Sequence, residues 1–303
     1  MRGAGSVRAH SRKVDLASYS SHRGCNKAWS TRFSMSQAAQ PSPAEIYDSY
    51  LVPGMFDRWA PVLIDTAAPR SGEDVLDFGC GTGIVARHLA PRLGGDGRIT
   101  GLDPNPDMLA VARSRPAPEG AGVRWQEGTA DDLPTETFDL ALSQQSLQFC
   151  PDPEAALGAL RRALRPGGRL ALAVWKALDH QPVFKPMLEA GAEEVGSRLE
   201  DIALPFSLGE RRELRAMLSD AGFRDVDVAE ATREVRFPDP DRFVRLTILS
   251  AAAVVPELQA LDGDGRERVV ERVRTAIAPT VKRYTEGGEI AFPMQALIAT
   301  GRR

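Results

Sequence analysis

A glycine-rich segment offers the clearest chemistry in this sequence. Residues 75–83 read Val-Leu-Asp-Phe-Gly-Cys-Gly-Thr-Gly, so that Gly79, Gly81 and Gly83 follow a short apolar run. Glycines let the backbone approach a ligand closely, and the start of a following helix presents free N–H groups. A dinucleotide fingerprint has the spacing GxGxxG, whereas Ile84 stands here in the place of the last glycine. The segment predicts a cofactor turn unlike that for NAD or FAD, with a purely structural turn as the alternative.

A carboxylate follows at a spacing that suits a ribose. Asp103 lies 20 residues after Gly83, at the end of a second apolar run. A carboxylate in that place can accept hydrogen bonds from both hydroxyls of a ribose that carries no phosphate. Capping of the helix that starts after Pro104 is the alternative role for Asp103.

Strands and helices must alternate to place these residues together. Apolar residues at helical spacing predict a helical segment over 44–68, which Pro53-Gly54 divides in two. The following pattern predicts a parallel sheet with helices on both faces. The expected strands are 74–78, 98–103, 123–126, 138–143 and 169–175, and the expected helices are 84–93, 107–114 and 153–165.

The second half of the chain has a looser pattern. Helices are expected over 184–199 and 210–221, and strands over 226–237 and 290–299. Between these two strands lies a mostly helical block at residues 239–287. This block is either a lid that closes an apolar pocket or a helical layer that completes the core.

Together these residues resemble the class I S-adenosylmethionine-dependent methyltransferase family, from about Tyr47 to the C-terminus. Residues 75–83 match the family's first motif, Asp103 its ribose acid, and residues 138–140 and 164–168 its later landmarks. Residues 144–149 with Pro151-Asp152, and residues 291–294, further resemble a bacterial branch that acts on small molecules. The resemblance implies an α/β, Rossmann-like, doubly wound sheet of seven strands, with the last strand antiparallel and a helical insertion before it.

The same resemblance implies S-adenosylmethionine as the cofactor and assigns residues to it. The glycine turn would hold the methionine end, and Asp103 with Met108 the ribose and one adenine face. Thr129 stands where many relatives have an acid for the adenine amino group, so Asp131 is the candidate. Tyr47 or Tyr50 could reach the cofactor carboxylate, although core packing is the alternative. The candidate cofactor-binding residues are Tyr47, Asp77, Gly79, Cys80, Gly81, Gly83, Asp103, Pro104, Met108, Ala130, Asp131, Ser143 and Gln144.

Candidate catalytic groups are few. His180 follows the fifth expected strand, at the sheet edge where ligands bind in open α/β folds, and is the candidate general base, with a solvated loop residue as the alternative. The fourth strand ends in Ser143-Gln144-Gln145-Ser146, without the Asn/Asp-Pro-Pro-aromatic motif of base and amide N-methyltransferases and without an acid for magnesium. A metal-independent reaction is expected. Gln144 and Gln148 are candidates to line the site, with helix N-terminal polarity as the alternative.

The amino-acid composition limits the classes of partner that this protein is expected to bind. Residues 1–34 hold seven of the 38 basic and one of the 41 acidic residues, so the rest of the chain has a net charge of −9. Such a charge disfavours nucleic acid. The first 34 residues resemble a transit peptide in composition, or form a disordered or non-native extension before a domain at 35–303. The apolar run at 246–255 is too short to span a membrane. Three cysteines without a CxxC pair indicate no zinc site or disulfide framework and fit the cytoplasm.

The sequence thus predicts methyl transfer from S-adenosylmethionine to a small molecule. One alternative is a protein that binds this cofactor without methylating, as a cyclase or a binding module. A second is an NAD-dependent oxidoreductase, which the glycine spacing and the missing Tyr-x-x-x-Lys pair disfavour. The acceptor atom, oxygen, nitrogen or carbon, and the oligomeric state stay open.

Overall fold

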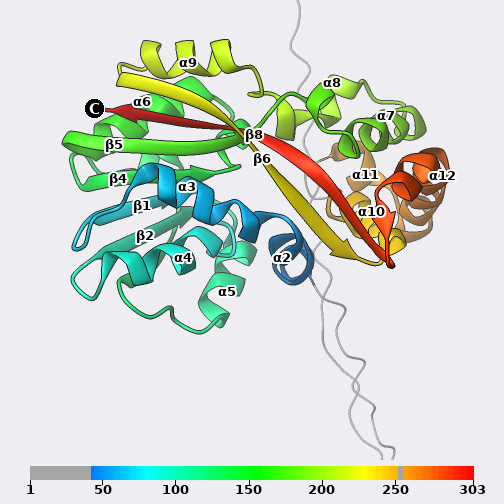
Figure 1. Cartoon of the computed structure of the whole chain (residues 1–303), viewed down its shortest axis with the longest axis horizontal. Helices are drawn as coiled ribbons and strands as arrows, with labels where there is room; N and C mark the ends of the chain where they lie inside the picture. Colours follow the sequence, from blue (N-terminus) through cyan, green and yellow to red (C-terminus); the bar gives the residue numbers. More distant parts are fainter. Residues whose placement is uncertain (1–41, 252–254) are drawn as a thin grey trace, which may run out of the picture. The chain divides into compact units, whose positions relative to one another are not determined.

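A mixed β-sheet forms the centre of the fold (Figure 1). The structure is a computed structural model that describes residues 42–251 and 255–303, so the expected extension at 1–34 lies outside the described residues. The strand order is β3-β2-β1-β4-β5-β8-β6. β8 runs antiparallel to both β5 and β6, and the other neighbouring pairs are parallel. The strands are β1 Asp74–Phe78, β2 Arg98–Asp103, β3 Gly122–Glu127, β4 Phe138–Gln144, β5 Leu164–Trp175, β6 Arg224–Pro238 and β8 Glu289–Arg302.

The sheet has the predicted seven strands and one short addition. Thr285–Glu286 forms β7, which pairs with the start of β8, so the described residues form an eight-stranded sheet. β5 begins at Leu164 instead of residue 169, because Leu164 already pairs with Phe138, before a register shift in which the extra residues lie on β5. The segment expected as a helix end and turn at 164–168 is therefore part of a strand.

Helices cover both faces of the sheet, as the alternating pattern predicts (Figure 1). α3 and α4 pack on one face, with α6 and α9 on the other. Successive residues of a strand point to opposite faces of the sheet. Val75 lies in the hydrophobic core under α3 and α4, and Leu76 lies in the hydrophobic core under α6 and α9. These helices are α3 Ala60–Ala67, α4 Ile84–Leu93, α5 Pro106–Ser114, α6 Pro153–Ala163 and α9 Arg211–Asp220.

The chain enters the sheet through a broken helical segment. Ser42 caps it, because its hydroxyl accepts from the Glu45 N–H. The helical segment is divided next to Pro53-Gly54 as expected, since α2 ends at Gly54 and Met55 is not helical. The segment has more than the two expected parts. They are α1 Pro43–Ile46, the π-helical η1 Tyr47–Leu51, α2 Val52–Gly54 and the 3-10 turn η2 Phe56–Arg58 before α3.

Helices from two parts of the sequence gather beyond the ends of the long strands β6 and β8 (Figure 1). The expected helix at 184–199 is interrupted, because Gly196 takes a left-handed conformation at φ 69° and ends α7. The described part of the block at 239–287 contains three helices, of which α12 packs against α7 and α10. The elements are α7 Phe184–Val195, α8 Leu199–Ile202, α10 Pro240–Ala251, α11 Pro256–Ala260 and α12 Gly263–Arg283.

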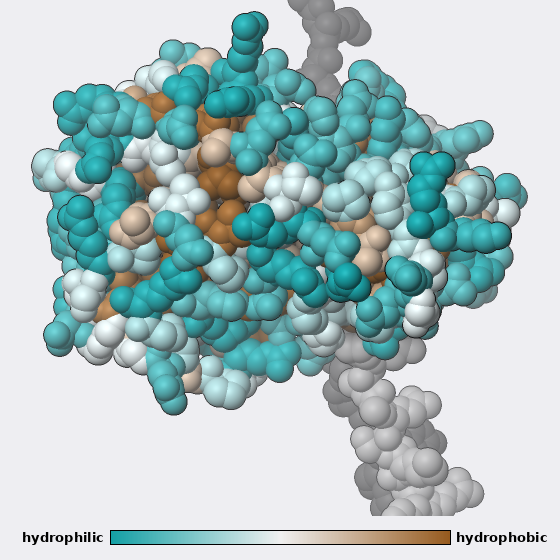
Figure 2. Space-filling model, in the orientation of Figure 1, coloured by the Kyte–Doolittle hydropathy of each residue, from teal (hydrophilic) through white to brown (hydrophobic). Residues whose placement is uncertain are grey.

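The outer surface is mostly hydrophilic in the orientation of Figure 2. Apolar atoms are visible chiefly where β5 and β8 lie between α3 and α9. Of the helices in residues 42–251 and 255–303, none is long and apolar enough to cross a membrane.

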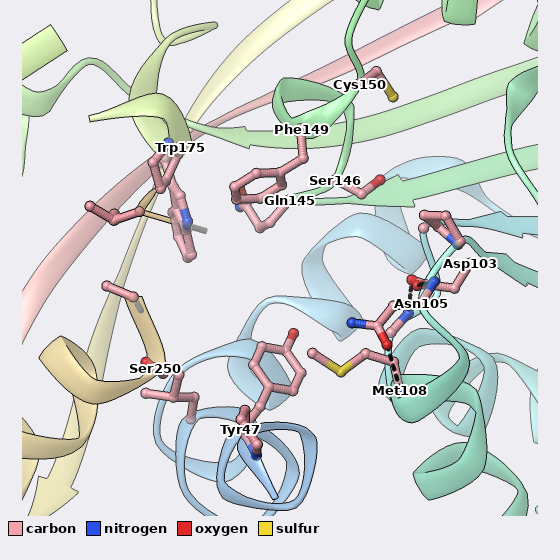
Figure 3. Close-up of a pocket in the computed structure, with 18 of the residues that line it drawn as sticks. Tyr47, Asp103, Asn105, Met108, Gln145, Ser146, Phe149, Cys150, Trp175 and Ser250 are labelled. Carbon is pink, nitrogen blue, oxygen red and sulfur yellow. Dashed lines mark hydrogen bonds between the residues drawn. The ribbon is translucent and has the colours of Figure 1, made fainter. Parts of the chain in front are cut away.

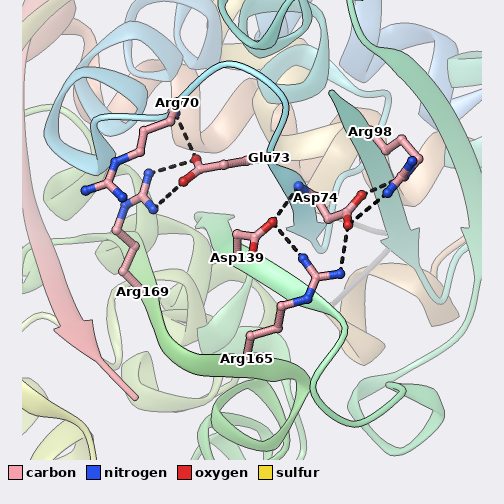
Figure 4. A network of polar contacts seen from close by, with 7 residues as sticks. All are labelled: Arg70, Glu73, Asp74, Arg98, Asp139, Arg165 and Arg169. Atoms are coloured by element: carbon pink, nitrogen blue, oxygen red, sulfur yellow. Dashed lines mark hydrogen bonds and ion pairs between the residues drawn. The ribbon is translucent and has the colours of Figure 1, made fainter. Parts of the chain in front are cut away.

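Ion pairs tie together the amino ends of the central strands (Figure 4). Arg165 at the start of β5 bridges Asp139 of β4 at 2.7 Å and Asp74 of β1 at 2.8 Å. Arg98 of β2 also contacts Asp74, at 2.6 Å. The two later family landmarks, 138–140 and 164–168, therefore meet at this end of the sheet.

Candidate functional site

The glycine turn lies at the carboxyl end of β1, beside the end of β2. The N–H groups of Gly79 and Cys80 both donate to the Leu102 carbonyl, at 2.8 and 3.0 Å. Gly79 has φ 68°, and a β-carbon there would lie 2.3 Å from the Ser146 Cβ. A side chain at position 79 is therefore excluded both by conformation and by space.

Asp103 is held against this turn by two backbone donors. Its carboxylate accepts from Gly81 N–H at 2.8 Å and from Asn105 N–H at 2.9 Å. Asn105, and not Asp103, caps α5, because its side chain accepts from the N–H groups of Asp107 and Met108. Burial raises the pKa of Asp103 above its usual value. The capping alternative is therefore excluded, and Asp103 is free to face a ligand.

Four of the candidate residues support the turn from behind instead of facing the cavity described below. Asp77 is buried on β1 and accepts from Ala86 N–H at 3.2 Å, which fixes the start of α4. Burial, followed by the charge of Asp103, raises the pKa of Asp77 to about 7. Gly83 has φ 87°, and a β-carbon there would lie 2.3 Å from the Trp125 ring.

Cys80 and Ser143 are the other two candidate residues that lie behind the glycine turn. The Cys80 thiol is buried, and burial raises its pKa. The hydroxyl of Ser143 contacts the hydroxyl of Ser146 at 2.7 Å, and Ser146 donates to the Phe78 carbonyl at 2.9 Å. This chain of hydroxyls joins the end of β4 to the end of β1.

The turn after β3 presents the candidate adenine acid. Thr129 caps the 3-10 turn η3, Ala130–Asp132, and its own N–H donates to Asp132 at 2.8 Å. Asp132 is thereby occupied within the turn, whereas Ala130 and Asp131 line the cavity. Of the two aspartates of this turn, Asp131 therefore lines the cavity and Asp132 does not.

The two tyrosines of the first helical segment have different surroundings. Tyr47 lines the cavity, with its hydroxyl directed toward the cavity interior in Figure 3. Burial raises the pKa of Tyr47 well above its usual value. Tyr50 instead packs against Phe237, with ring centroids 5.3 Å apart, and its hydroxyl donates to the Pro238 carbonyl at 3.4 Å. Of the two alternatives, Tyr47 faces the cavity and Tyr50 packs in the core.

One cavity of about 960 Å³ connects the turn with the helical insertion. In Figure 3, Asp103, Asn105 and Met108 lie on one side, and Trp175 and Ser250 on the other. The first side also includes Gly79, Gly81 and Pro104. The second side is mainly apolar and includes Phe56, Phe184, Met187, Phe206, Ile248, Leu258, Val269 and Met294.

Buried amides line the cavity at the end of β4, where the sequence pointed to Gln144 and Gln148. Gln144 lines the cavity and donates to the Phe56 carbonyl at 3.2 Å, but its Oε1 has no partner among the described residues. Gln145 is 6% exposed, and neither its Nε2 nor its Oε1 has a partner there. An unpartnered buried amide costs about 1 to 3 kcal/mol. Gln148 is buried with its amide also unpartnered, but lies outside the cavity lining.

His180 does not join the other candidates. It is exposed at the end of the 3-10 turn η5, Leu178–His180, and is not part of the cavity lining. The expectation of a histidine base at the reaction centre is therefore not supported by the geometry. Conversely, Gln145, Thr247 and Trp175 line the cavity although the sequence reasoning did not select them. The residue types at these three positions did not indicate that their side chains would line the cavity.

Comparisons with known proteins agree with this geometry. Residues 75–168 match the family described as Methyltransferase domain. The chain is 30% identical to the nocamycin O-methyltransferase of Saccharothrix syringae over 281 residues, which cover 86% of this chain and 95% of that protein. It is 34% identical to the 2-phytyl-1,4-naphtoquinone methyltransferase of Synechococcus elongatus, over 48% of this chain and 63% of that protein.

A solved structure shows the same fold. A protein from Anabaena variabilis, described as a candidate methyltransferase from an antibiotic biosynthesis pathway, aligns with a TM-score of 0.57 and 17% identity. The alignment covers 80% of this chain and 96% of that protein. The relatives do not favour the alternatives of a non-methylating protein or an oxidoreductase. The glycine turn, the carboxylate of Asp103 and a relationship that covers 86% of the chain lead to one conclusion: the chain belongs to the class I S-adenosylmethionine-dependent methyltransferases, enzymes that use S-adenosylmethionine as cofactor.

Proposed function

We propose that methyl transfer takes place inside the cavity, with the cofactor against the glycine turn and the acceptor against the helical insertion. The observation that carries this proposal is one continuous cavity of about 960 Å³ between Asp103 and Val269. Ligand pockets commonly measure about 300 to 1,000 Å³. The cavity is at the upper end of this range and has room for donor and acceptor together.

The residues around the turn fit the cofactor's polar parts. A carboxylate can accept more hydrogen bonds than the two that Asp103 receives from the backbone, so it can also hold ribose hydroxyls. The Tyr47 hydroxyl would bind the methionine carboxylate, and Asp131 the adenine amino group. Pro104, Met108 and Ala130 would pack against the adenosine. Asp77, Cys80, Gly83 and Ser143 would keep the turn in shape.

The protein's part in the reaction is to align the acceptor with the methyl group and to exclude bulk water. The sulfonium of the cofactor supplies an activated methyl group, so an aligned nucleophile suffices. As the acceptor atom bonds to the methyl carbon, the bond from sulfur to that carbon breaks and S-adenosylhomocysteine remains. The acceptor's proton leaves to solvent. The insertion at 239–287 would act as the lid, since Ile248, Leu258 and Val269 form the apolar wall.

The acceptor in this proposal is an oxygen of a small molecule. The relative that matches the chain over 95% of its own length is an O-methyltransferase, which supports oxygen over nitrogen or carbon. A reaction without metal and without nucleic acid belongs to the same proposal. The net charge of −9 outside residues 1–34 disfavours nucleic acid. Unpaired Cys80 and Cys150 support a cytoplasmic location.

Two measurements test this function. Calorimetry with S-adenosylhomocysteine should show binding at one site, and NADH should show none. Incubation with cofactor labelled in the methyl group and a panel of small phenols, amines and carboxylic acids should then give a labelled product. Binding of S-adenosylhomocysteine without label transfer to any acceptor would favour the non-methylating alternative. Preference for NADH would contradict the proposal altogether.

A further inference from the structure

Gln145 stands out within the cavity because it combines three unusual features. It is buried, it takes a left-handed conformation at φ 54°, and both polar atoms of its side chain lack partners among the described residues. Left-handed conformations are uncommon for residues other than glycine and are found where the surrounding structure imposes them. Here the Gln145 N–H donates to the Ala173 carbonyl at 2.8 Å, which continues the pairing of β4 with β5.

The position of Gln145 is at the boundary between the two sides of the cavity. In the view of Figure 3 it lies between Trp175 on one side and Asp103 with Asn105 on the other. A buried amide normally has hydrogen-bond partners. An amide without them, at the place where donor and acceptor must meet, points to a partner supplied by the acceptor.

Two further polar groups of the cavity also lack partners. They are the Gln144 Oε1 and the buried hydroxyl of Thr247 on α10. All three side chains are uncharged. Within the described residues the lining contains no Lys, Arg or His, so nothing there would neutralise an anionic acceptor. Around these groups the wall is apolar.

The titratable groups of the lining restrict the acceptor further. Four aspartates line the cavity, Asp103, Asp107, Asp131 and Asp152, and all belong to the part of the chain from β2 to the start of α6. The described lining of the apolar side offers no His, Lys, Asp or Glu as a base. An acceptor hydroxyl that binds uncharged must then be acidic enough to release its proton to a water molecule as the bond to the methyl carbon forms, as in a phenol or an enol.

We propose that the acceptor is an uncharged, largely apolar phenol or enol whose reacting oxygen is held by the side-chain amide of Gln145. This inference rests on the proposed function and names the substrate class for the same site. Methyl transfer forms the bond between the acceptor oxygen and the methyl carbon and breaks the bond between that carbon and the sulfonium sulfur. The hydroxyl proton passes to solvent.

The test uses three naphthalene probes of similar size and the full chain saturated with S-adenosylhomocysteine. Naphthol is a neutral phenol, naphthoate is an anion, and naphthylmethanol is a neutral aliphatic alcohol. Calorimetry should show naphthol binding at least about ten-fold more tightly than naphthoate, a difference of ~1.4 kcal/mol. With labelled S-adenosylmethionine, naphthol should be methylated and naphthylmethanol should not.

Variants at position 145 test the role of the amide. Gln145→Leu keeps the size of the side chain without its polar atoms and should weaken naphthol binding about ten-fold while leaving naphthalene binding unchanged. Its thermal midpoint should stay the same or rise, because an unpartnered amide is removed. Gln145→Asn retains an amide in a residue that tolerates the left-handed conformation and should keep part of the preference for naphthol. Gln126→Leu, outside the cavity lining, is the matched control and should change neither affinity.

The outcomes separate this inference from the function on which it rests. If S-adenosylhomocysteine does not bind, the proposed function fails. If it binds but naphthoate binds as tightly as naphthol, the inference on an uncharged acceptor is overturned. A Gln145→Leu variant that keeps the full preference for naphthol over naphthalene would overturn the role of Gln145. Methylation of naphthylmethanol would overturn the restriction to phenols and enols.

Discussion

Two buried carboxylates, Asp77 and Asp103, lie side by side at the ends of β1 and β2. The two residues are 1% and 8% exposed, and burial raises the pKa of both carboxyl groups. Asp103 has two backbone donors and lines the cavity, whereas Asp77 has one and lies behind it. The same residue type therefore has two positions at this site, since Asp103 lines the cavity and Asp77 supports the turn behind it.

Asp77 should make the ligand-free protein less stable as the pH rises. Its pKa is about 7 in the folded protein, above the usual value of 3.8, so the folded state binds the proton more tightly than the unfolded state. The stabilising contribution is present at low pH and is lost as the pH rises toward 7. The loss between pH 5 and pH 8 should be about 3 kcal/mol.

The measurement compares the wild type with Asp77→Asn by urea unfolding at both pH values. The wild type should lose about 3 kcal/mol more than Asp77→Asn over this interval. Asp107→Asn, on the exposed first turn of α5, is the control and should follow the wild type. Parallel pH profiles of Asp77→Asn and the wild type would show that Asp77 titrates normally.

Asp103→Ala should weaken binding of S-adenosylhomocysteine. Loss of hydrogen bonds to a charged group costs about 1 to 3 kcal/mol, which calorimetry can resolve. Part of this loss comes from the turn itself, because Gly81 and Asn105 lose their acceptor. Asp107→Ala in the same cavity lining separates a specific effect from a general change of charge. An unchanged affinity for Asp103→Ala would place the ribose elsewhere.

At the scale of the elements, the two ends of the strands have separate tasks. The carboxyl ends of β1, β2, β4 and β5 carry the cavity, and the amino ends carry the ion-pair network of Asp74, Asp139 and Arg165. Asp139 also accepts from the Asp74 N–H at 2.9 Å. This network fixes the alignment of three neighbouring strands without any contact to the site.

Asp139→Ala should therefore lower stability and leave cofactor binding intact. The variant removes one ion pair and leaves the Asp74 N–H without its acceptor, which should cost about 1 to 2 kcal/mol in urea unfolding. The affinity for S-adenosylhomocysteine should stay within about two-fold of the wild type. Glu200→Ala, which breaks an exposed ion pair with Arg198, should change neither quantity and serves as the control. A large loss of affinity in Asp139→Ala would contradict the separation of the two ends.

At the scale of the whole molecule, the site is assembled from the first helical segment, the sheet, the helical segment at 184–206 and the insertion. Among the described residues the lining extends from Pro43 to Met294. We propose that residues 1–34 take no part in it. A chain that begins at Met35 should bind S-adenosylhomocysteine with the affinity of the full chain in calorimetry. A loss of about ten-fold or more would show that the first 34 residues belong to the binding unit.

Local patterns predicted most of the elements that carry the site. The helix at 84–93 has the predicted bounds, and the strand before the glycine turn is the one expected at 74–78. The errors have more than one cause. β5 begins at Leu164 because β4, which is distant in the chain, offers a partner there. Thr285–Glu286 becomes a strand because β8 folds back on it in a tight hairpin, and Gly196 ends α7 before residue 199.

The sequence by itself determined the cofactor turn, the acid after the second strand and the alternation of strands and helices. These features depend on residues close in the chain, since glycine spacing and apolar periodicity act through local backbone geometry. Only the tertiary structure decided that Tyr47 faces the cavity and Tyr50 does not, and that His180 lies outside. It also decided that Gln145 is buried without a hydrogen-bond partner among the described residues. Those outcomes depend on which distant segments pack around each side chain, and residue type does not encode them.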